Sequence, residues 1–555
     1  MANTSFDVVI LGGGLAGLTL SLQLKQARPE MSILTLEMRS GDAPAAAHKV
    51  GESTVELGTH YLREVLDLKD YLDREQLPKH GLRFFFTPQH KAQIDKRVEL
   101  GPRELLPVPS HQLDRGTLEN ELTRRAEEIG VQLILGAKVT AVDLDETGHL
   151  ITYSLEGNTH TAKGRWVVDA TGRSSFLKRK LGFKKDLDHD VNSAWFRVKG
   201  EIHLEDYSDN PTWCAYVAPG LRRLSTVHFM GEGYWVWFIP LATGNTSIGI
   251  VADPRFHSLD TYNKYDKAME WLKEYEPFCY KILDGKREDV LDFRMLKHFA
   301  HSSERLFSTE RWAVTGESGV FLDPFYSPGT DFISLSNTLV ADLIQRDLNQ
   351  EDIHLRTNVY ELTLFALFDN WVPVYRSMYA LWGHTQTMVL KIFWDWAAYW
   401  SVPTLLFTNN GYTNIIVLRE LFATEGCVGQ RFGFLNTQMQ RLFVDWSAHD
   451  TTTFSNRYID PFDVGYLREF HKGIDERHTQ HELIQKVHEN MTVLEGVATE
   501  IFRLMSNTVY GTPMDMKVDP YTMDLTVHPK NNPDGVLAAS NIQEEVRVMW
   551  FYPLN

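Results

Sequence analysis

A glycine-rich segment near the N-terminus has the residue types and the spacing that bind a dinucleotide. Gly12, Gly14 and Gly17 follow a short apolar run, Phe6–Leu11, and precede helix-compatible residues. In this arrangement the first glycine allows a sharp turn, the second lets the backbone approach a pyrophosphate, and the third lets a helix pack closely on a strand. The positive end of that helix favours an anion. We expect strand, turn and helix here, although a glycine-rich turn without a ligand has the same pattern.

An acidic residue, Glu37, strengthens the dinucleotide hypothesis. A second predicted strand, Ser32–Leu36, ends just before it. Glu37 lies about 20 residues past the last glycine, where an acceptor for ribose hydroxyls is expected. A carboxylate there favours an unphosphorylated ribose, so FAD or NAD is expected in preference to NADP.

Lys79 and a pair of tryptophans are the next candidates for chemistry. Trp235 and Trp237 stand two residues apart on a predicted strand, so both indoles point to the same side and can wall a cavity. An amine in a partly desolvated pocket has a lowered pKa, which lets Lys79 act as a nucleophile or as a hydrogen-bond donor. Each feature also has an ordinary interpretation: core aromatics of a strand, and a solvated turn lysine between Pro78 and Gly81.

The composition is that of a globular, acidic chain. The 555 residues include 73 acidic and 56 basic side chains, giving a net charge of -17, with 43% hydrophobic residues. This length suggests roughly two to three domains. The negative field repels phosphate backbones, so nucleic acid is not an expected partner. We see no export signal, no transmembrane segment and no disulfide framework, so a cytoplasmic location is predicted.

Two later segments resemble the further cofactor-contact segments of FAD monooxygenases of the aromatic-hydroxylase type. They are Trp166–Arg173 and Trp312–Pro324, and with the glycine loop they imply FAD. In the second segment Glu317 replaces an aspartate that usually meets ribityl or ribose hydroxyls, and its extra methylene would push the carboxylate outward. Arg115, in His111–Leu122, resembles the arginine of this family that faces the flavin. A surface ion-pairing helix is the alternative for Arg115.

The segment Trp235–Pro240 carries the complete WxWxIP sequence of flavin-dependent halogenases, a family that shares the aromatic-hydroxylase FAD fold. The chain resembles this family, in which the tryptophans stand between the flavin and the organic substrate. Lys79, after Gly51–Ser53 and a helix, matches the family's catalytic lysine, which directs hypohalous acid to the substrate. The resemblance assigns catalysis to Lys79, Trp235, Trp237 and Ser327. It assigns cofactor binding to Gly12, Gly14, Leu15, Ala16, Gly17, Glu37, Gly51, Glu52, Ser53, Arg115, Val139, Asp169, Gly172, Gly316, Glu317 and Gly329.

The loop Phe325–Thr330 resembles the segment in which halogenases bind halide on backbone amides. The expected halide-binding residues are Pro328, Gly329 and Thr330, but proline has no N–H, so the last two would supply the donors. Chloride or bromide is the expected halide. Tryptophan halogenases carry a glutamate where this chain has Tyr326, and phenols and pyrroles can dispense with that acid. We therefore expect a phenolic or pyrrolic substrate next to Tyr326, either free or tethered to a carrier protein.

The predicted fold class is α/β: a Rossmann-type FAD-binding domain with a mixed-sheet substrate domain, followed by a mainly helical C-terminal region. The core is placed at residues 1–350 and the aromatic-rich C-terminal domain at 351–555. Within the core, nucleotide-binding segments are expected at 1–50, 100–185 and 300–350, and the substrate-side sheet at 186–300. Tryptophans and tyrosines between residues 371 and 400 predict a helical core that closes over the site, with a channel or a partner surface as the alternative.

These features together imply a halogenase that uses FADH2, oxygen and halide. A separate flavin reductase would supply the reduced cofactor, and hypohalous acid would pass behind the tryptophans to Lys79 and then to an aromatic carbon. One alternative is a flavin-dependent aromatic monooxygenase or dehydrogenase of the same fold. Another is a non-catalytic flavoprotein that binds a partner through its C-terminal region.

Overall fold

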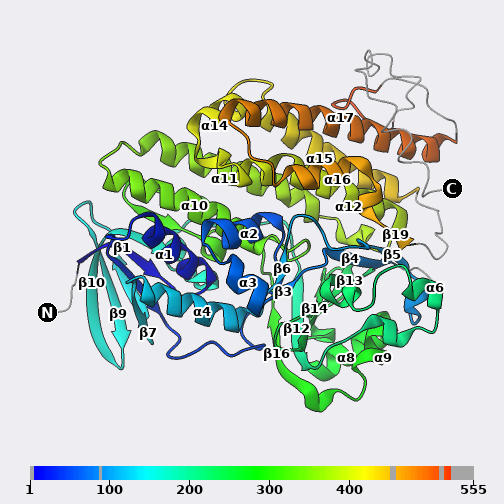
Figure 1. The fold of residues 1–555 in the computed structure, drawn as a ribbon, viewed down its shortest axis with the longest axis horizontal. Coiled ribbons are helices and arrows are strands. Elements are labelled where there is room, and N and C mark those ends of the chain that lie inside the picture. The colour runs from blue at the N-terminus through cyan, green and yellow to red at the C-terminus, as the bar shows by residue number, and fades with distance from the viewer. Residues whose placement is uncertain (1–4, 87–90, 450–457, 512–517, 527–555) are drawn as a thin grey trace.

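The first sheet contains a parallel ladder that is buried on both faces. A computed structural model of the protein describes residues 5–86, 91–449, 458–511 and 518–526 (Figure 1). The strands of this sheet are β1 (Ser5–Leu11), β2 (Ile33–Glu37), β7 (Gln132–Leu135), β8 (Lys138–Asp143), β9 (His149–Leu155), β10 (Asn158–Asp169) and β18 (Trp312–Val314). Their order is β7-β2-β1-β10-β9-β8, with β18 beside β10, and β1 is parallel to both its neighbours. Burial on both faces explains why β1 reads as a continuous apolar run.

The carboxyl ends of these strands gather the predicted dinucleotide residues at one edge. Gly12 follows β1, Glu37 ends β2 and Asp169 ends β10. Ligands of open α/β sheets bind at this edge. Directly after the glycine loop, α1 (Leu15–Ala27) packs against α4 (Arg115–Glu128) and α10 (Gly329–Leu348).

The second sheet is mixed and has two differently covered faces. Its strands are β4 (Leu82–Phe86), β5 (Val98–Leu100), β12 (Asn192–Lys199), β13 (Thr226–Gly231), β14 (Tyr234–Pro240), β15 (Asn245–Ala252), β16 (Val290–Leu296) and β19 (Tyr458–Ile459), in the order β16-β12-β15-β14-β13-β4-β5-β19. Val236 and Phe238 of β14 pack in one core with α8 (Tyr265–Tyr275) and α9 (Pro277–Leu283). Trp235 and Trp237 alternate with them and belong to the central core on the other side.

This sheet extends beyond the segment 186–300 in which we expected it. β4 and β5 come from the first hundred residues, and β19 comes from the C-terminal region. β13 is parallel to β4, and β5 is parallel to β19, so these pairings are long-range in sequence and leave no local hairpin signal.

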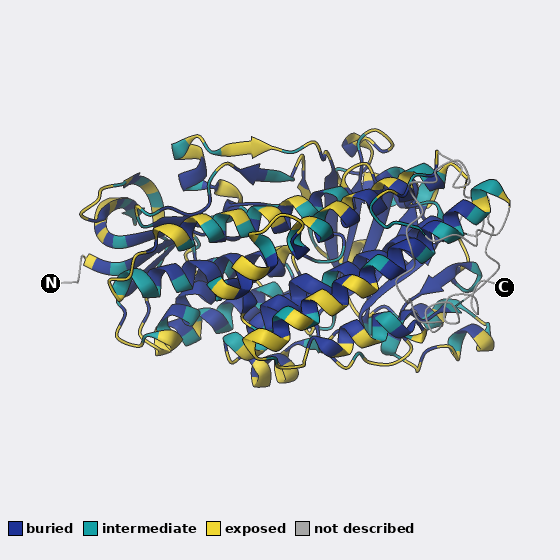
Figure 2. Ribbon diagram, turned by 90° about the horizontal axis from the view of Figure 1, so that it is seen from above, coloured by how far each residue is buried: buried dark blue, intermediate teal, exposed yellow. Residues whose placement is uncertain are grey.

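Helices of the C-terminal region lie along one side of both sheets (Figure 1). Besides α10 they are α11 (His354–Tyr375), α12 (Thr385–Tyr399), α13 (Leu405–Thr408), α14 (Ile415–Phe422), α15 (Val428–Ser447), α16 (Gly465–Gly473) and α17 (Gln480–Tyr510). Seen from above, exposed stripes alternate with buried stripes along the outer helices (Figure 2), as amphipathic packing requires. The predicted fold class is confirmed. Residues 527–555 of the predicted C-terminal domain lie outside the described residues.

Short elements connect the layers and place individual side chains. They are α2 (Glu56–His60), α3 (Lys69–Glu75), β3 (Leu77–Pro78), β6 (His111–Gln112), α5 (Phe176–Leu181), β11 (Lys184–Asp186), α6 (Pro211–Cys214), α7 (Leu221–Leu224) and β17 (His301–Ser303). A π-helical turn, Trp400–Thr404, joins α12 to α13. In the parts of the chain that the structure describes, every helix is too short or too polar to cross a membrane.

Candidate active site

The glycine loop has the geometry that a nucleotide requires. Gly12 has a φ of +106°, and a Cβ there would lie 2.4 Å from the carbonyl oxygen of Ala170. A Cβ on Gly17 would lie 1.9 Å from the oxygen of Gly12, so only glycine allows α1 to approach β1 this closely. The carboxylate of Glu37 accepts hydrogen bonds from the N–H of Gly13 (2.7 Å) and from that of Arg39 (2.8 Å). The predicted turn, helix start and acid therefore lie together.

Other predicted nucleotide residues surround this edge. Asp169 is buried and accepts hydrogen bonds from the backbone N–H groups of Thr171 (2.9 Å) and Leu177 (2.7 Å), so it shapes the loop that contains Gly172. Val139 lies half-buried on the edge strand β8 and is not part of either cavity described below. Leu15 and Ala16 begin α1, and Asn337 of α10 donates a hydrogen bond to the carbonyl of Ala16 (3.0 Å).

A cavity with about 890 Å³ of unfilled space, named here the cofactor-side cavity, collects twelve of the predicted residues. They are Gly51, Glu52, Ser53, Arg115, Trp235, Trp237, Gly316, Glu317, Ser327, Pro328, Gly329 and Thr330. Two buried atoms of these residues, Glu52 Oε2 and Arg115 Nε, have no hydrogen-bond partner among the described residues. Buried polar atoms are normally paired, so a bound group with its own donors and acceptors fits this wall. The residues present are those that would hold FAD.

Charged groups around the cofactor-side cavity are held in place by one another. Glu52 Oε1 accepts a hydrogen bond from Arg197 Nε (2.9 Å), and burial raises the pKa of Glu52. Arg115 donates to Glu119 (2.5 Å) and to the carbonyl of Val50 (2.9 Å), so it forms an ion pair on α4 and also faces the cavity. Burial likewise raises the pKa of Glu317.

The two tryptophans form one wall of the cofactor-side cavity. Their ring centroids are 5.6 Å apart, and both side chains are almost fully buried. Trp235 Nε1 donates to the hydroxyl of Tyr379 (3.2 Å), and Trp237 Nε1 donates to the hydroxyl of Ser247 (3.2 Å). Neither tryptophan lines the second cavity, which contains Lys79. The expectation that this pair stands between the flavin and the organic substrate stays a prediction.

The loop Phe325–Thr330 separates the two cavities. Tyr326 lines the second cavity, while Ser327, Gly329 and Thr330 line the cofactor-side cavity. Among the described residues, Pro328 alone lines both. Tyr326 and Ser327 both have left-handed φ values, +68° and +62°, and α10 begins immediately after Pro328. First-turn N–H groups of a helix have no acceptor within it, so Gly329 and Thr330 present donors at the positive helix end.

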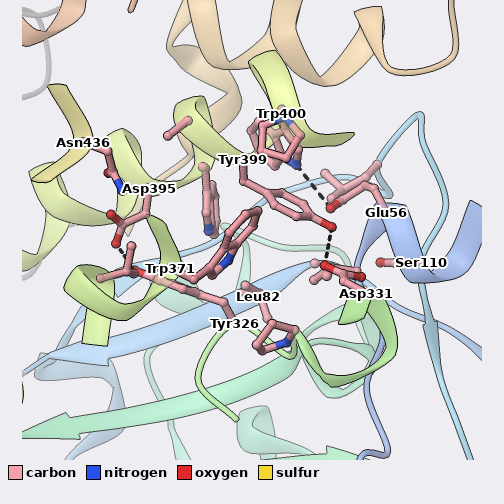
Figure 3. A pocket seen from close by; sticks show the side chains of 18 of the residues that line it. Glu56, Leu82, Ser110, Tyr326, Asp331, Trp371, Asp395, Tyr399, Trp400 and Asn436 are labelled. Carbon is pink, nitrogen blue, oxygen red and sulfur yellow. Dashed lines mark hydrogen bonds between the residues drawn. The ribbon is translucent and has the colours of Figure 1, made fainter. Parts of the chain in front are cut away.

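The second cavity, named here the lysine cavity, has about 840 Å³ of unfilled space. Tryptophan and tyrosine side chains form part of its wall, and the carboxylates of Glu56, Asp331 and Asp395 lie among them (Figure 3). The lining residues that carry the argument are Glu56, Lys79, Tyr326, Pro328, Asp331, Trp371, Asp395, Trp396, Tyr399, Trp400 and Asn436.

Lys79 is held at the end of a short ribbon and points into the protein. β3 pairs with β6, and the N–H of Lys79 donates to the carbonyl of Ser110 (2.8 Å). The side chain is only 3% exposed, and Nζ donates to the carbonyl of Thr54 (2.6 Å). Among the described residues no carboxylate lies within 4.0 Å of Nζ, so this ammonium has no ion-pair partner. Burial lowers the pKa of Lys79 to about 7, against the opposing charges of Glu56 and Asp331.

Two carboxylates lie on the same side of the lysine cavity. Asp331, in the first turn of α10, accepts hydrogen bonds from the N–H of Gly58 (2.8 Å) and from the hydroxyl of Tyr399 (2.8 Å). Burial raises the pKa of Asp331 to about 7. Glu56 Oε2 accepts a hydrogen bond from Trp400 Nε1 (3.2 Å), as Figure 3 shows. The pKa values of Lys79 and Asp331 therefore both lie near 7, so each group can gain or lose a proton at neutral pH.

The residues that sequence reasoning missed come mainly from helices without a recognisable motif. They are Glu56, Asp331, Asp395 and Asn436. The aromatic cluster at residues 371–400 was the signal available, and Trp371, Trp396, Tyr399 and Trp400 do close over Lys79. Nothing in the spacing of Asp331 or Glu56 distinguishes either from an ordinary helix-surface acid.

The chain is similar in sequence to FAD-binding proteins and halogenases, and similar in fold to solved halogenase structures. Residues 5–245 match the family model of an FAD binding domain. The flavin-dependent halogenase chlA of Dictyostelium discoideum is 27% identical over 496 residues, which cover 80% of each chain. The 1H-pyrrole-2-carbonyl-(peptidyl-carrier protein) chlorinase of Pseudomonas fluorescens is 23% identical over 407 residues, 69% of this chain and 85% of that one. The halogenase PltM in complex with phloroglucinol and FAD has the same fold, with a TM-score of 0.61, 16% identity and coverage of 89% and 96%.

Proposed function

We propose that this chain, a relative of the flavin-dependent halogenases and an oxidoreductase with an FAD-binding domain, halogenates a phenolic or pyrrolic ring in the lysine cavity. It would use FADH2 from a separate reductase, oxygen, and chloride or bromide. The observation that carries the proposal is Lys79: a buried amine without an ion-pair partner among the described residues, on the far side of a loop from the cofactor-side cavity.

FAD, when bound in reduced form, supplies the redox chemistry that converts oxygen and halide into hypohalous acid. On the protein side, the N–H groups of Gly329 and Thr330 would hold the halide at the start of α10, because Pro328 offers no donor. Trp235 and Trp237 would exclude water and organic substrate from this side.

Lys79 would present the halogen to the ring. One proton of Nζ is committed to Thr54, which fixes the direction of the amine and leaves its other positions for hypohalous acid. With a pKa near 7, Lys79 is available both as an amine nucleophile and as an ammonium donor. Both uses stay open.

The aromatic wall and the carboxylates support an electron-rich, hydrogen-bonding ring as the substrate. Trp371, Trp396 and Trp400 can stack on a planar ring, while Asp331 can accept its O–H or N–H proton. The pyrrole chlorinase among the relatives and the phloroglucinol complex of PltM concern rings of this kind. The proposal includes both free and carrier-tethered substrates. It also includes a cytoplasmic location.

One reconstitution tests it. Purified protein with FAD, NADH and a generic flavin reductase is offered chloride, bromide or no halide, with phenols, pyrroles and indoles, free and on a carrier protein. We expect halogenated phenol or pyrrole, identified by mass and isotope pattern, and only with halide present. Oxygenated product would indicate an aromatic monooxygenase, and the absence of any product-forming reaction of the reduced flavin with oxygen would indicate a non-catalytic flavoprotein.

A further inference from the structure

The loop that separates the cavities is held in an unfavourable conformation. Tyr326 and Ser327 are consecutive residues with side chains and left-handed φ values of +68° and +62°. Such a conformation is disfavoured for residues other than glycine and persists only where the surroundings impose it. Within the loop, the N–H of Phe325 bonds to its near neighbour Asp323 (2.9 Å) and that of Ser327 to the carbonyl of Pro324 (2.9 Å). Two restraints that reach beyond the loop involve tyrosine and aspartate side chains of the C-terminal region.

The first restraint acts on the side chain of Tyr326. Its hydroxyl donates to Asp395 Oδ2 of α12 (2.9 Å), and Lys391 Nζ donates to the same oxygen (2.6 Å). Gln440 of α15 donates to the other oxygen, Oδ1 (2.8 Å). Lys391 is fully buried, and its contact with Asp395 supplies the partner that a buried amine needs. This anchor for the Tyr326 hydroxyl is therefore stiff.

The second restraint acts at the start of the loop. The hydroxyl of Tyr379 donates to Asp323 Oδ2 (2.7 Å), and His189 Nε2 lies 2.8 Å from the same oxygen. The Tyr379 oxygen also accepts the hydrogen bond from Trp235 Nε1. One C-terminal side chain therefore fixes both the loop and the tryptophan wall.

We propose that the C-terminal region, through Asp395 and Tyr379, holds Asp323 and the loop Phe325–Thr330 as the partition between the two cavities, and so confines hypohalous acid to its passage toward Lys79 and keeps it out of bulk solvent. Tyr326 is a positioning residue in this proposal, because its hydroxyl is occupied by Asp395 and its ring faces the lysine cavity. The inference rests on the proposed function for its chemical consequence, but the mechanical restraint stands on the contacts alone.

The test uses Tyr326→Phe, which removes one hydroxyl and keeps the ring. Its matched control is Tyr375→Phe. Tyr375 is a buried neighbour, with ring centroids 6.3 Å apart, and its hydroxyl has no hydrogen-bond partner among the described residues. Hydrogen exchange of the backbone amides of Phe325, Tyr326 and Ser327 is measured in the full-length protein. We expect about tenfold faster exchange in Tyr326→Phe and no change in Tyr375→Phe. Equal exchange in both variants overturns the restraint.

The chemical consequence is measured as the coupling of NADH consumption to halogenation. Halogenated product per NADH consumed is measured in the presence of monochlorodimedone, a diffusible scavenger of hypohalous acid. We expect Tyr326→Phe to bind FAD normally, to lose at least about threefold in coupling and to halogenate the scavenger correspondingly more. Unchanged coupling in Tyr326→Phe refutes the partition. A wild-type protein that makes no halogenated product refutes the proposed function instead, and the exchange measurement still decides the restraint.

Discussion

The two cavities on either side of the loop Phe325–Thr330 are lined by different kinds of residues. The cofactor-side cavity uses glycines, first-turn amides and side chains from segments with recognisable motifs, all before residue 334. The lysine cavity combines a buried amine with three buried carboxylates and draws its aromatic wall from residues 371–400, with further lining up to Phe462. Holding a large cofactor requires close backbone approach, which glycine provides, whereas directing a reactive halogen requires ionisable groups kept away from water.

Replacing Lys79 should produce the largest loss of halogenated product, and it should leave FAD binding in the cofactor-side cavity unchanged. Lys79→Met is expected to lower halogenated product by at least about a hundredfold, because no other amine of the described residues lines the lysine cavity. FAD affinity, measured by flavin fluorescence, should stay within about twofold. Retained product would remove Lys79 from the mechanism, and lost FAD binding would show that the two cavities are not independent.

The same variant should be more stable than the wild type. The pKa of Lys79 falls from 10.5 to about 7 on folding, so the unfolded chain binds more protons, and this destabilisation is fully present below pH 7 and fades as pH rises toward 10.5. Replacing the amine should therefore add about 2–4 kcal/mol at pH 6.5, even after the hydrogen bond to Thr54 is lost. Urea unfolding of the FAD-free protein measures the difference, and a destabilised variant would assign Lys79 a structural role.

Asp331 is one of the two carboxylates whose charge acts on Lys79, and a variant of it tests the lysine cavity further. Asp331→Asn is expected to lower turnover of a phenol about ten- to a hundredfold, since a positioned base typically contributes at least this much. The pKa of Asp331 is raised to about 7, so the carboxylate form is lost as pH falls through 7. Wild-type turnover should therefore rise with pH across 6 to 8, and this rise should be smaller in the variant, where only Lys79 still titrates in this range. Asp369→Asn, on the exposed side of α11, is the control, and an undiminished rise in Asp331→Asn would contradict the assignment.

A matched pair of tryptophan variants tests whether the cavities are separate. Trp237→Phe should weaken FAD binding about three- to tenfold and leave the KM for the aromatic substrate unchanged, because Trp237 lines only the cofactor-side cavity. Trp396→Phe should raise the KM for the aromatic substrate and leave FAD binding unchanged, because Trp396 lines only the lysine cavity. Both parameters changing together in either variant would mean that the loop is not a partition.

Glu317→Asp should give the smallest effect. The side chain lines the cofactor-side cavity, and an aspartate is the shorter alternative at this position. We expect FAD affinity to change by less than about threefold, because the loop can absorb one methylene. A change above about tenfold would show that Glu317 contacts the cofactor in a fixed geometry.

Much of the cofactor side could be predicted from the sequence, because backbone geometry limits residue choice there. Gly12, Gly17 and Glu37 occupy positions that few other residues tolerate, and the WxWxIP strand places both indoles on one face. The lysine cavity could not be predicted in the same way. Asp331 becomes special only because α2 supplies the N–H of Gly58 and α12 supplies Tyr399. The position of the tryptophans relative to the partition depended on a loop whose left-handed residues carry no sequence signal.

The two-residue strand β19 has a consequence for anyone who recombines such proteins. It joins the outer edge of the second sheet beside β5. There the N–H of Gly101 donates to the carbonyl of Ile459 (3.0 Å), and the hydroxyl of Tyr458 donates to the carbonyl of Gly101 (2.6 Å). A chimera spliced after residue 350 would therefore exchange a strand of the recipient's own sheet along with the helices. A functional hybrid should therefore take β19 and its partner strand β5 from the same parent protein.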